Sequence, residues 1–368
     1  MMRALILDRS WGNPYSRGLA AGLRQAGVEV KVAGPAGLGA DVSAYPPAAV
    51  GVSKLRKAPS AAAGIARLAT VAATWKPDLI HVQWQEPIDA ALLRVAQRVA
   101  PKAAVVLTIH NPAERRGDEE AANGLEAMLA QADAVIVHGP LLAKQFEDAH
   151  PGFKGKVSVV EHGNYAHVVG NFTKEEARQR LGIEESEKVV SFFGHLRRRK
   201  GIEDLIDAVA LLPDSPLLVI GGAALDDDYL DTLVARAAGA KVKVRWLASL
   251  EPLSQRDLDC VVASADVVAL PFLDASQSGS VIYAMTQGAC VVTSAVGELP
   301  RTLEGRGVLV PPGDTQALSS AISSCLADPA RCQALGKAAA AYANTSLDWS
   351  AIGQVVRDSV YLPVVAND

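Results

Sequence analysis

Residues 188–212, KVVSFFGHLRRRKGIEDLIDAVALL, place a short apolar run, a basic loop and a helical pattern one after another. The run VVSFFG is typical of a buried parallel strand, and IEDLIDAVALL repeats apolar residues at helical spacing. A glycine, three arginines and a lysine therefore lie on a loop between a strand and a helix. In an open α/β sheet such loops form the ligand crevice, so these cations either bind an anion such as a diphosphate or form a solvated basic turn.

Strand-like runs alternate with Ala-rich and Leu-rich helical segments on both sides of this stretch. The first series is RALILD, VEVKVAG, PDLIHVQW, AAVVLTIH, ADAVIVHG and KVSVVEHG; the second is KVVSFFG, SPLLVIGG, AKVKVRWLA, ADVVALP, ACVVTSA and GVLVPPG. Such alternation predicts doubly wound parallel sheets of the α/β class. We expect two Rossmann-like domains, at 1–164 and 189–345, with a linker at 165–188. The helical tail at 346–368 is expected to return to the N-terminal domain.

The composition is that of a folded globular protein. The chain has 368 residues, 49% of them hydrophobic and 21% charged, and its net charge of −4 is too mild for a nucleic-acid-binding protein. Residues 1–164 carry 18 Lys and Arg against 15 Asp and Glu, which favours an acidic acceptor or an anionic membrane surface. The basic run SKLRKAPS at 53–60 is either a membrane-surface contact or a solvated loop. No leader peptide or membrane span is evident, so we expect a cytoplasmic protein, with the inner face of the membrane as a site of peripheral contact.

Cysteines and histidines give no sign of a metal site. The cysteines form no C-x-x-C pair and are expected to be buried free thiols, in keeping with a reducing compartment: Cys260, Cys290, Cys325 and Cys332. No cysteine pair lies near a histidine, and no G-x-G-x-x-G follows the first strand of either half. We therefore expect neither a bound metal nor a dinucleotide or other cofactor.

A second loop in the C-terminal half has the features of a phosphate site. In ALPFLDASQSGSVIYAMTQG, at 269–288, a strand ends, a Gly/Ser loop follows and a helix begins. Ser278, Gly279 and Ser280 would lie at the helix N-terminus, where backbone N–H groups attract phosphate oxygens or where serine merely caps the helix. With two such loops in one domain, Arg197 and Lys200 can hold an anion by side chain while 278–280 hold it by main chain.

These segments, together with VVEHGNY, EEARQRLGI, LLVIGG and GVLVPPGD, resemble the GT-B nucleotide-sugar glycosyltransferases, and especially the large family of retaining hexosyltransferases. The resemblance covers nearly the whole chain. It implies two Rossmann-like domains that face each other across a cleft and transfer of a hexose from a nucleoside diphosphate sugar to a hydroxyl or amine, without a metal. The acceptor would be a small molecule, a saccharide or a lipid-linked molecule. The resemblance also implies that Arg197 and Lys200 hold the diphosphate and that Ser278, Gly279 and Ser280 hold the distal phosphate.

The chain departs from that family at its carboxylates. Two glutamates usually flank the second loop, and their places fall on Ala275 and Tyr283, while His195 stands where an arginine usually follows the loop glycine. A mannosyltransferase-like subgroup without this pair is more similar, through TIHN, HGNY and FGHLRRRKG. Whether the anomeric configuration is retained or inverted is therefore open. The resemblance implies a further set of donor-binding or cleft-lining residues: Gly194, His195, Tyr283, His162 and Gly163.

Candidate catalytic groups follow the strands of the first domain. His110 comes directly after the strand VVLTI and can bind the transferred sugar or pass a proton. For inversion, Glu114 is the best-placed carboxylate base, followed by Asp8; for retention, the leaving diphosphate can act as the base. The acceptor space is expected to be bordered by residues of GNPYSRG: Gly12, Asn13 and Tyr15. A nucleotide-sugar epimerase or phosphorylase of the same architecture, or a nucleotide-sugar-binding protein without turnover, is the alternative.

Overall fold

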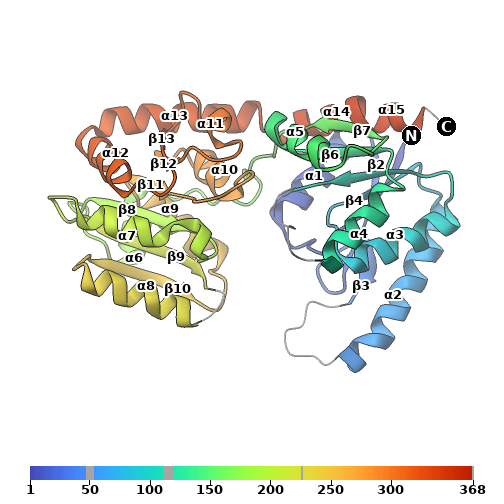
Figure 1. Cartoon of the computed structure of the whole chain (residues 1–368), viewed down its shortest axis with the longest axis horizontal. Helices are drawn as coiled ribbons and strands as arrows, with labels where there is room; N and C mark the ends of the chain where they lie inside the picture. Colours follow the sequence, from blue (N-terminus) through green and yellow to red (C-terminus); the bar gives the residue numbers. More distant parts are fainter. Residues whose placement is uncertain (47–53, 111–118, 225–226, 367–368) are drawn as a thin grey trace. The chain divides into compact units, whose positions relative to one another are not determined.

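The computed structural model describes residues 1–46, 54–110, 119–224 and 227–366 and divides the chain into two compact units (Figure 1). The first unit consists of Met1–Gly163 and Ser346–Asp368, and the second of Asn164–Thr345. Each unit has its own fully parallel sheet with helices packed against it, which confirms the predicted α/β fold class. Residues 165–188, predicted as a linker, belong to the second unit.

The first unit is built on a seven-stranded sheet in the order β3-β2-β1-β4-β5-β6-β7. Its strands are β1 (Arg3–Leu7), β2 (Glu29–Pro35), β3 (Val42–Tyr45), β4 (Leu79–Val82), β5 (Ala104–Thr108), β6 (Ala134–Val137) and β7 (Lys156–Val159). The strand order reverses between β1 and β4, and ligands of open α/β sheets bind beyond the carboxyl ends of the strands at such a point. The loops that follow β1, β4 and β5 are therefore the ones to examine for function.

Helices and the C-terminal segment cover both faces of this sheet. They are α1 (Pro14–Gln25), α2 (Lys54–Trp75), α3 (Pro87–Val99), α4 (Glu119–Leu129), α5 (Pro140–Ala149), α14 (Trp349–Val356), the π-helical turn Arg357–Tyr361 and α15 (Leu362–Val365). Alternate residues of each strand enter different cores, as period-two alternation requires. Leu5 and Leu7 pack under α2 and α3, whereas Ala4 and Ile6 pack with α1 and the C-terminal helices.

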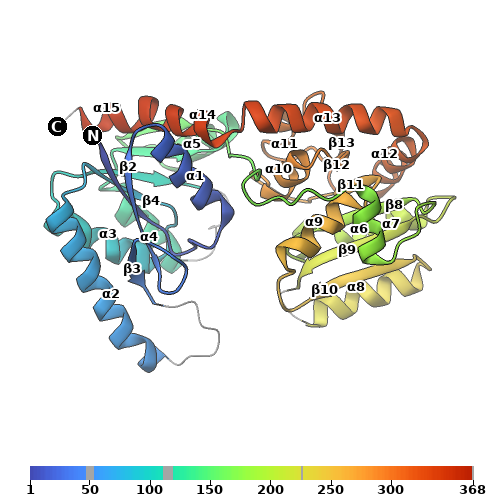
Figure 2. The ribbon, with the colours of Figure 1, turned by 180° about the vertical axis from the view of Figure 1, so that it is seen from behind.

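The C-terminal helix α14 packs directly on α1 (Figure 2). Gly18 and Gly22 of α1 leave no room for a side chain, because a Cβ would lie 2.2 Å from the Trp349 ring and 1.9 Å from the Trp349 carbonyl oxygen, respectively. On the other helix, a Cβ at Gly353 would lie 2.2 Å from the backbone of Gly22. The helices thus meet through glycine backbone, and Trp349 fills the contact with 6% of its surface exposed.

The second unit is built on a six-stranded sheet in the order β10-β9-β8-β11-β12-β13. Its strands are β8 (Val189–Phe193), β9 (Leu217–Ala223), β10 (Val244–Ser249), β11 (Val267–Leu270), β12 (Val291–Ser294) and β13 (Val308–Val310). Its helices are α6 (Lys174–Leu181), α7 (Ile202–Ala210), α8 (Asp227–Gly239), α9 (Gln255–Ala263), α10 (Gly279–Thr286), α11 (Leu299–Thr302), α12 (Thr315–Ala327) and α13 (Pro329–Thr345). One apolar core runs through the unit, and the strand order reverses between β8 and β11.

The predicted linker contains a helix with clear start and stop signals. Thr173 caps α6 by accepting from the N–H of Glu176, whose side chain accepts from the Thr173 N–H in return, and Gly182 ends the helix in the left-handed region. α6 packs against α9, and Arg178 is buried with an ion pair of 3.0 Å to Asp266. These contacts account for the inclusion of 165–188 in the second unit.

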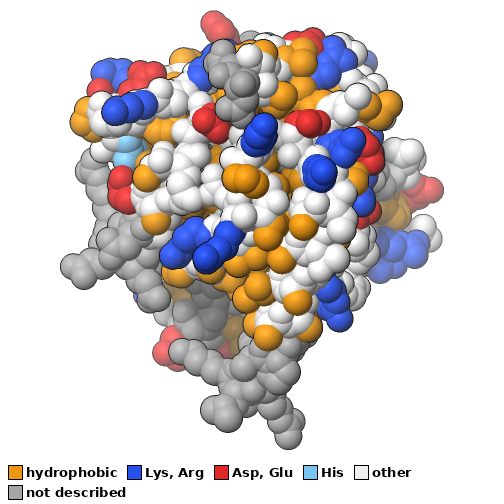
Figure 3. All heavy atoms as spheres, turned by 90° about the vertical axis from the view of Figure 1, so that its right-hand side faces the viewer, with side chains coloured by type: hydrophobic (Ala, Val, Ile, Leu, Met, Phe, Trp, Pro, Cys, Tyr) orange, Lys and Arg blue, Asp and Glu red, His pale blue; other side chains and the backbone are white. Residues whose placement is uncertain are grey.

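The surface of the first unit carries both signs of charge. On the face shown in Figure 3, Lys and Arg side chains lie among Asp, Glu and apolar side chains. The side chains of 53–60, the predicted membrane-contact run, lie outside the described residues. Within the described ranges, every helix is too short or too polar to cross a lipid bilayer.

The glycine contact between α1 and α14 predicts a large cost for one added methyl group. Gly22→Ala would place a Cβ 1.9 Å from the Trp349 carbonyl oxygen, so we expect a loss of about 1–3 kcal/mol in the free energy of unfolding. Gly152→Ala is the control, because nothing lies within 4 Å of its Cβ position. Thermal unfolding of both variants tests the packing, and equal melting temperatures would contradict it.

Candidate functional site

The basic loop after β8 is held in place by main-chain contacts. Gly194 has a φ of +124°, and its N–H donates to the Gly221 carbonyl oxygen at 3.0 Å. A Cβ at Gly222 would lie 1.8 Å from the Gly194 carbonyl oxygen, and a Cβ at Gly201 would lie 2.0 Å from that of Pro271. The turn of 3-10 helix at Arg198–Lys200 therefore has both of its ends fixed against neighbouring strands.

The second predicted loop meets the first. Ser278 caps α10, its Oγ accepting from the N–H of Val281 at 3.3 Å. The N–H groups of Gly279 and Ser280 lie in the first helical turn, where no intrahelical carbonyl is available to them. A Cβ at Gly194 would lie 3.2 Å from Ser280 Oγ, so the two loops are in contact. The strand-order reversal of the second sheet thus carries two anion-competent loops side by side.

The cations of the basic loop differ in their surroundings. Arg197 Nε is buried and, among the described residues, has no hydrogen-bond partner. Lys200 Nζ lies 3.9 Å from the centroid of the Phe272 ring. Burial, and next to it the positive charges of Arg197 and Lys200, lower the pKa of His195, so these three side chains share one electrostatic environment. His195 is therefore favoured as a neutral ring beside two fixed cations.

Arg198 points elsewhere. Its side chain is 76% exposed, forms an ion pair of 3.7 Å with Glu203 and lies over the Tyr229 ring at 5.1 Å. Of the consecutive basic residues, Arg197 and Arg198 thus have opposite roles: one supplies an unsatisfied buried donor, and the other is a solvated surface cation. Sequence alone could not separate them.

Tyr283, expected among the donor-binding or cleft-lining residues, is buried. Its hydroxyl donates to the Asp259 carboxylate and accepts from Gln255, and its ring packs on Phe193 and Tyr165. With 4% of its surface exposed, it is part of the core of the second unit.

Two residues beside the second loop had not been singled out. The Tyr165 hydroxyl lies 2.4 Å from the Cβ position of Gly279, so only glycine fits there. Glu298 is 2% exposed; its N–H donates to the Ser276 carbonyl oxygen and its carboxylate accepts from Arg301 Nε at 2.9 Å. Tyr165 belongs to the motif HGNY, and that motif is the sequence signal that could have identified it. Its contact with Gly279, at the start of α10, is known only from the structure.

In the first unit, four aromatic rings gather around Tyr15. The centroid of its ring lies 4.8 Å from His110, 5.3 Å from His138, 4.8 Å from His162 and 5.1 Å from Trp349. The three histidines follow β5, β6 and β7, so their strands end at the same sheet edge. Tyr15, expected on the acceptor side, is buried at the centre of this cluster with 4% exposure.

The hydrogen bonds of the cluster determine where the His110 proton lies. The Val160 carbonyl can only accept, so His138 donates to it from Nδ1 at 3.0 Å. In neutral His138, Nε2 is then an acceptor, and His110 Nδ1 donates to it at 3.2 Å. His110 Nε2 therefore carries a lone pair; it is buried and has no hydrogen-bond partner among the described residues. It is an unused acceptor, suited to a ligand hydroxyl.

The cluster is held neutral. Burial is the main cause that lowers the pKa of His110, with a further contribution from the neighbouring histidines, and it lowers the pKa of His162 to about 3. A base with so low a pKa accepts a hydrogen bond more readily than a proton near neutral pH. His110 is thus better suited to bind a hydroxyl than to act as a proton shuttle.

Asp8 lies beside this cluster at the carboxyl end of β1. Its Oδ1 accepts from Trp84 Nε1 at 2.8 Å and from the N–H of Ser10 at 2.8 Å, and the Trp84 ring stacks on His110 at 4.8 Å. Asp8 Oδ2 is buried without a hydrogen-bond partner among the described residues. Burial raises the pKa of this carboxyl. The combination is that of a carboxylate poised to take a proton.

The remaining predicted residues have structural positions or lie outside the description. Glu114, the first-choice base, falls within 111–118 and so lies outside the described residues. Asn13 caps α1 by accepting from the Tyr15 N–H at 3.0 Å, and Gly12 is exposed next to it. A Cβ at Gly163 would lie 2.3 Å from the Trp349 ring, so this glycine is required by packing. His162 Nδ1 lies 2.9 Å from the Gly163 carbonyl oxygen.

A cluster of cysteines was also missed. The four cysteines are free and buried, as expected, but Cys290, Cys325 and Cys332 lie together. Cys290 is distant in sequence from the other two, and the proximity of all three depends on how α12 and α13 pack near the start of β12.

Comparisons with known proteins agree with this geometry. Residues 173–342 match the family described as glycosyl transferases group 1, and residues 13–164 match glycosyltransferase family 4. The D-inositol 3-phosphate glycosyltransferase of Mycobacterium ulcerans is 30% identical over 226 residues, covering 60% of this chain and 49% of that protein. That of Corynebacterium aurimucosum is 30% identical over 278 residues, covering 72% and 64%. The chain thus spans about half the length of the first relative and less than two thirds of the second.

Solved structures share the fold over the whole chain. Sucrose-phosphate synthase from Thermosynechococcus elongatus has a TM-score of 0.77 and 23% identity, with all of both chains covered. Anabaena HepE, in complex with UDP and glucose, has a TM-score of 0.76 and 21% identity, covering 98% of this chain and all of that chain. The fold expected from the sequence is therefore confirmed.

The neutral histidine cluster predicts a pH-dependent stability. The pKa of His162 falls from 6.5 in the unfolded chain to about 3, so the unfolded state binds more protons between these values and stability falls as pH drops below about 6.5. At pH 5 the loss from this one residue should be about 2 kcal/mol. We expect His162→Asn to lose less stability than the wild type between pH 7 and pH 5, as measured by urea unfolding. Parallel curves for the two proteins would contradict the assignment.

Proposed function

We propose that this chain, which belongs to the GT-B glycosyltransferases, moves a hexose from a nucleoside diphosphate sugar to an acceptor hydroxyl or amine. One observation carries the proposal: two loops of the second unit are in contact at Gly194 and Ser280. The first loop carries Arg197, whose buried Nε has no hydrogen-bond partner among the described residues, and the second opens helix α10. A diphosphate supplies the acceptors that these donors lack. The relatives' names favour a transferase over an epimerase, a phosphorylase or a binding protein without turnover.

In the proposed donor complex, Arg197 and Lys200 hold the diphosphate and the N–H groups of Ser278, Gly279 and Ser280 hold the distal phosphate. The bond between the anomeric carbon and the diphosphate oxygen breaks, and the acceptor oxygen or nitrogen bonds to that carbon. Negative charge grows on the leaving diphosphate, and fixed cations stabilise it without a metal ion. Each such contact is worth about 3 kcal/mol in the transition state.

His110 is proposed to bind a hydroxyl of the transferred sugar. Its Nε2 lone pair has no hydrogen-bond partner among the described residues, and the proton order from Val160 through His138 keeps that nitrogen unprotonated. Stacking on Trp84 fixes the ring plane. A hydroxyl that donates to Nε2 would therefore be held in one direction, and the His110 ring would not have to rotate to bind it.

The acceptor proton has two routes. Asp8 can take the proton directly, which is the route of an inverting enzyme: its buried Oδ2 has no hydrogen-bond partner among the described residues, and burial raises the pKa of the carboxyl more than the Ser16 hydroxyl lowers it. Alternatively, the leaving diphosphate takes it, which is the route of a retaining enzyme. The names of the relatives favour a small polyhydroxylated acceptor, and HepE supports UDP-glucose as the first donor to test.

The donor assignment predicts a difference between neighbouring arginines. Arg197→Ala and Lys200→Ala should weaken nucleoside diphosphate binding about tenfold to a hundredfold, since hydrogen bonds to charged groups contribute about 1.5–3 kcal/mol. Arg198→Ala should leave it unchanged, because that side chain pairs with Glu203 at the surface. Isothermal titration with UDP, GDP, ADP and dTDP measures this. Equal affinities for the three variants would refute the diphosphate assignment.

Turnover is predicted to depend on the His110 lone pair. His110→Phe keeps the stacking on Trp84 but removes the acceptor, so kcat/KM should fall about tenfold to a hundredfold while nucleoside diphosphate affinity stays the same. Release of nucleoside diphosphate from activated sugars across an acceptor panel, in the presence of a chelator, gives the rates. If no sugar is turned over by a protein that binds the nucleotide, it is a binding protein.

The two proton routes are separated in the same assay. Asp8→Asn should slow turnover about a hundredfold or more and the product should be inverted if Asp8 is the base. Retained configuration with an unchanged Asp8→Asn rate assigns the proton to the leaving diphosphate. Nuclear magnetic resonance of the product reads the anomeric configuration directly.

A further inference from the structure

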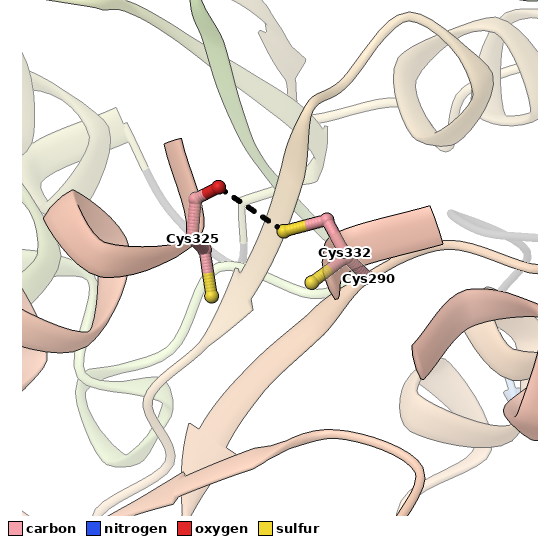
Figure 4. A group of neighbouring side chains, drawn as sticks. All are labelled: Cys290, Cys325 and Cys332. Atoms are coloured by element: carbon pink, nitrogen blue, oxygen red, sulfur yellow. Dashed lines mark hydrogen bonds between the residues drawn. The ribbon is translucent and has the colours of Figure 1, made fainter. Parts of the chain in front are cut away.

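Three cysteines of the second unit converge on one point (Figure 4). Cys290 directly precedes β12, Cys325 lies in the last turn of α12 and Cys332 in the first turn of α13. Their sulfur atoms all lie within 4.8 Å of one another. All three are buried, with exposures of 6%, 1% and 8%, respectively. The short connection between α12 and α13 brings two of the thiols to the third.

The sulfur spacing suits a metal ion. A Zn–S bond is about 2.3 Å long, so three thiolates around one ion lie about 3.8–4.0 Å apart. Side-chain rotations that move the sulfur atoms by a fraction of an ångström reach that spacing. Within the cluster, Cys332 Sγ lies 3.2 Å from the Cys325 carbonyl oxygen. Three buried thiolates need a cation to compensate their charge.

A pocket gives access to the cluster. It has a volume of about 1100 Å³ and is lined by the three cysteines together with Lys188, Asp266 and Ala289. Lys188, Asp266 and Cys290 directly precede β8, β11 and β12, so the pocket lies at the amino-terminal edge of the sheet. The phosphate loops lie beyond the carboxyl ends of β8 and β11. The cysteine cluster is therefore a separate site, independent of the proposed transfer reaction.

We propose that Cys290, Cys325 and Cys332 bind one thiophilic d10 metal ion, Zn²⁺ or Cu⁺, through three thiolates. Three sulfur–metal bonds replace three S–H bonds, and the protons pass to solvent through the pocket. Soft sulfur ligands select these ions over Mg²⁺ or Ca²⁺. Within the described ranges, no histidine or carboxylate joins the three sulfurs, so a fourth position for Zn²⁺ would face the pocket and hold water.

The test uses the reduced full-length chain, stripped of metal. Titration with Zn²⁺, and with Cu⁺ without oxygen, should give one bound ion per chain in competition with a chelator, and Mg²⁺ should not compete. Tighter binding of one of the two identifies the ion. Cys260→Ser is the matched control: it removes the buried cysteine of α9, which lies outside the cluster, and should keep the ion. Cys325→Ser and Cys332→Ser should each weaken binding at least a hundredfold.

A second readout needs no variant. The bound ion should protect three of the four thiols of the wild-type chain from alkylation, as mapped by mass spectrometry, and should raise its melting temperature. Nucleoside diphosphate affinity should not change, which separates this site from the donor site. The proposal would be overturned if the reduced wild type bound neither ion. It would also be overturned if the three cysteines formed a disulfide in air and their substitution left metal uptake unchanged.

Discussion

Close backbone contact at the carboxyl end of β8 is the constraint on which the two loops of the proposed donor site depend. The Gly194 N–H reaches the next strand, Gly222 leaves no space for a Cβ, and Gly201 packs against Pro271. These contacts use main chain, so the path of the loop does not depend on which side chains it carries. The fixed path leaves Arg197 with a buried Nε that has no hydrogen-bond partner in the described part of the chain, while Arg198, one residue on, reaches solvent. The path of the backbone thus decides which of these two arginines turns its side chain inward.

The first unit orders its site by a different means. The main-chain carbonyl of Val160 can only accept a hydrogen bond, so it places the proton of His138 on Nδ1 and, through His138, that of His110 on Nδ1. Burial lowers the pKa of His110 and of His138, which disfavours a second proton on either ring. The result is a hydrogen-bond acceptor with a fixed direction. Asp8, joined to the same group through Trp84, adds a carboxylate whose charge is poorly solvated.

The order of strands and helices, and the loops that carry the site, could be predicted from sequence because both are local. The pattern around 188–212 predicted a strand, a basic loop and a helix, and the structure has β8, a short turn and α7 there. Side-chain direction was less accessible. Whether Tyr283 on α10 faces the core or the solvent depends on how that helix packs. Glu298 can be recognised as a neighbour of the second loop only from the burial of its carboxylate. Cys290, Cys325 and Cys332 come together only when two helices pack on a strand.

The boundary between the units has a further consequence for how the chain is made. Trp349 fills the space left by glycines of α1, so one face of the first sheet is covered by α1 together with α14, the π-helical turn and α15. During synthesis, this cover stays incomplete until α14 and α15 have followed the whole second unit out of the ribosome. Contacts between residues this distant in sequence form slowly. Until then, the apolar side chains of the first unit that α14 and α15 cover stay exposed to solvent.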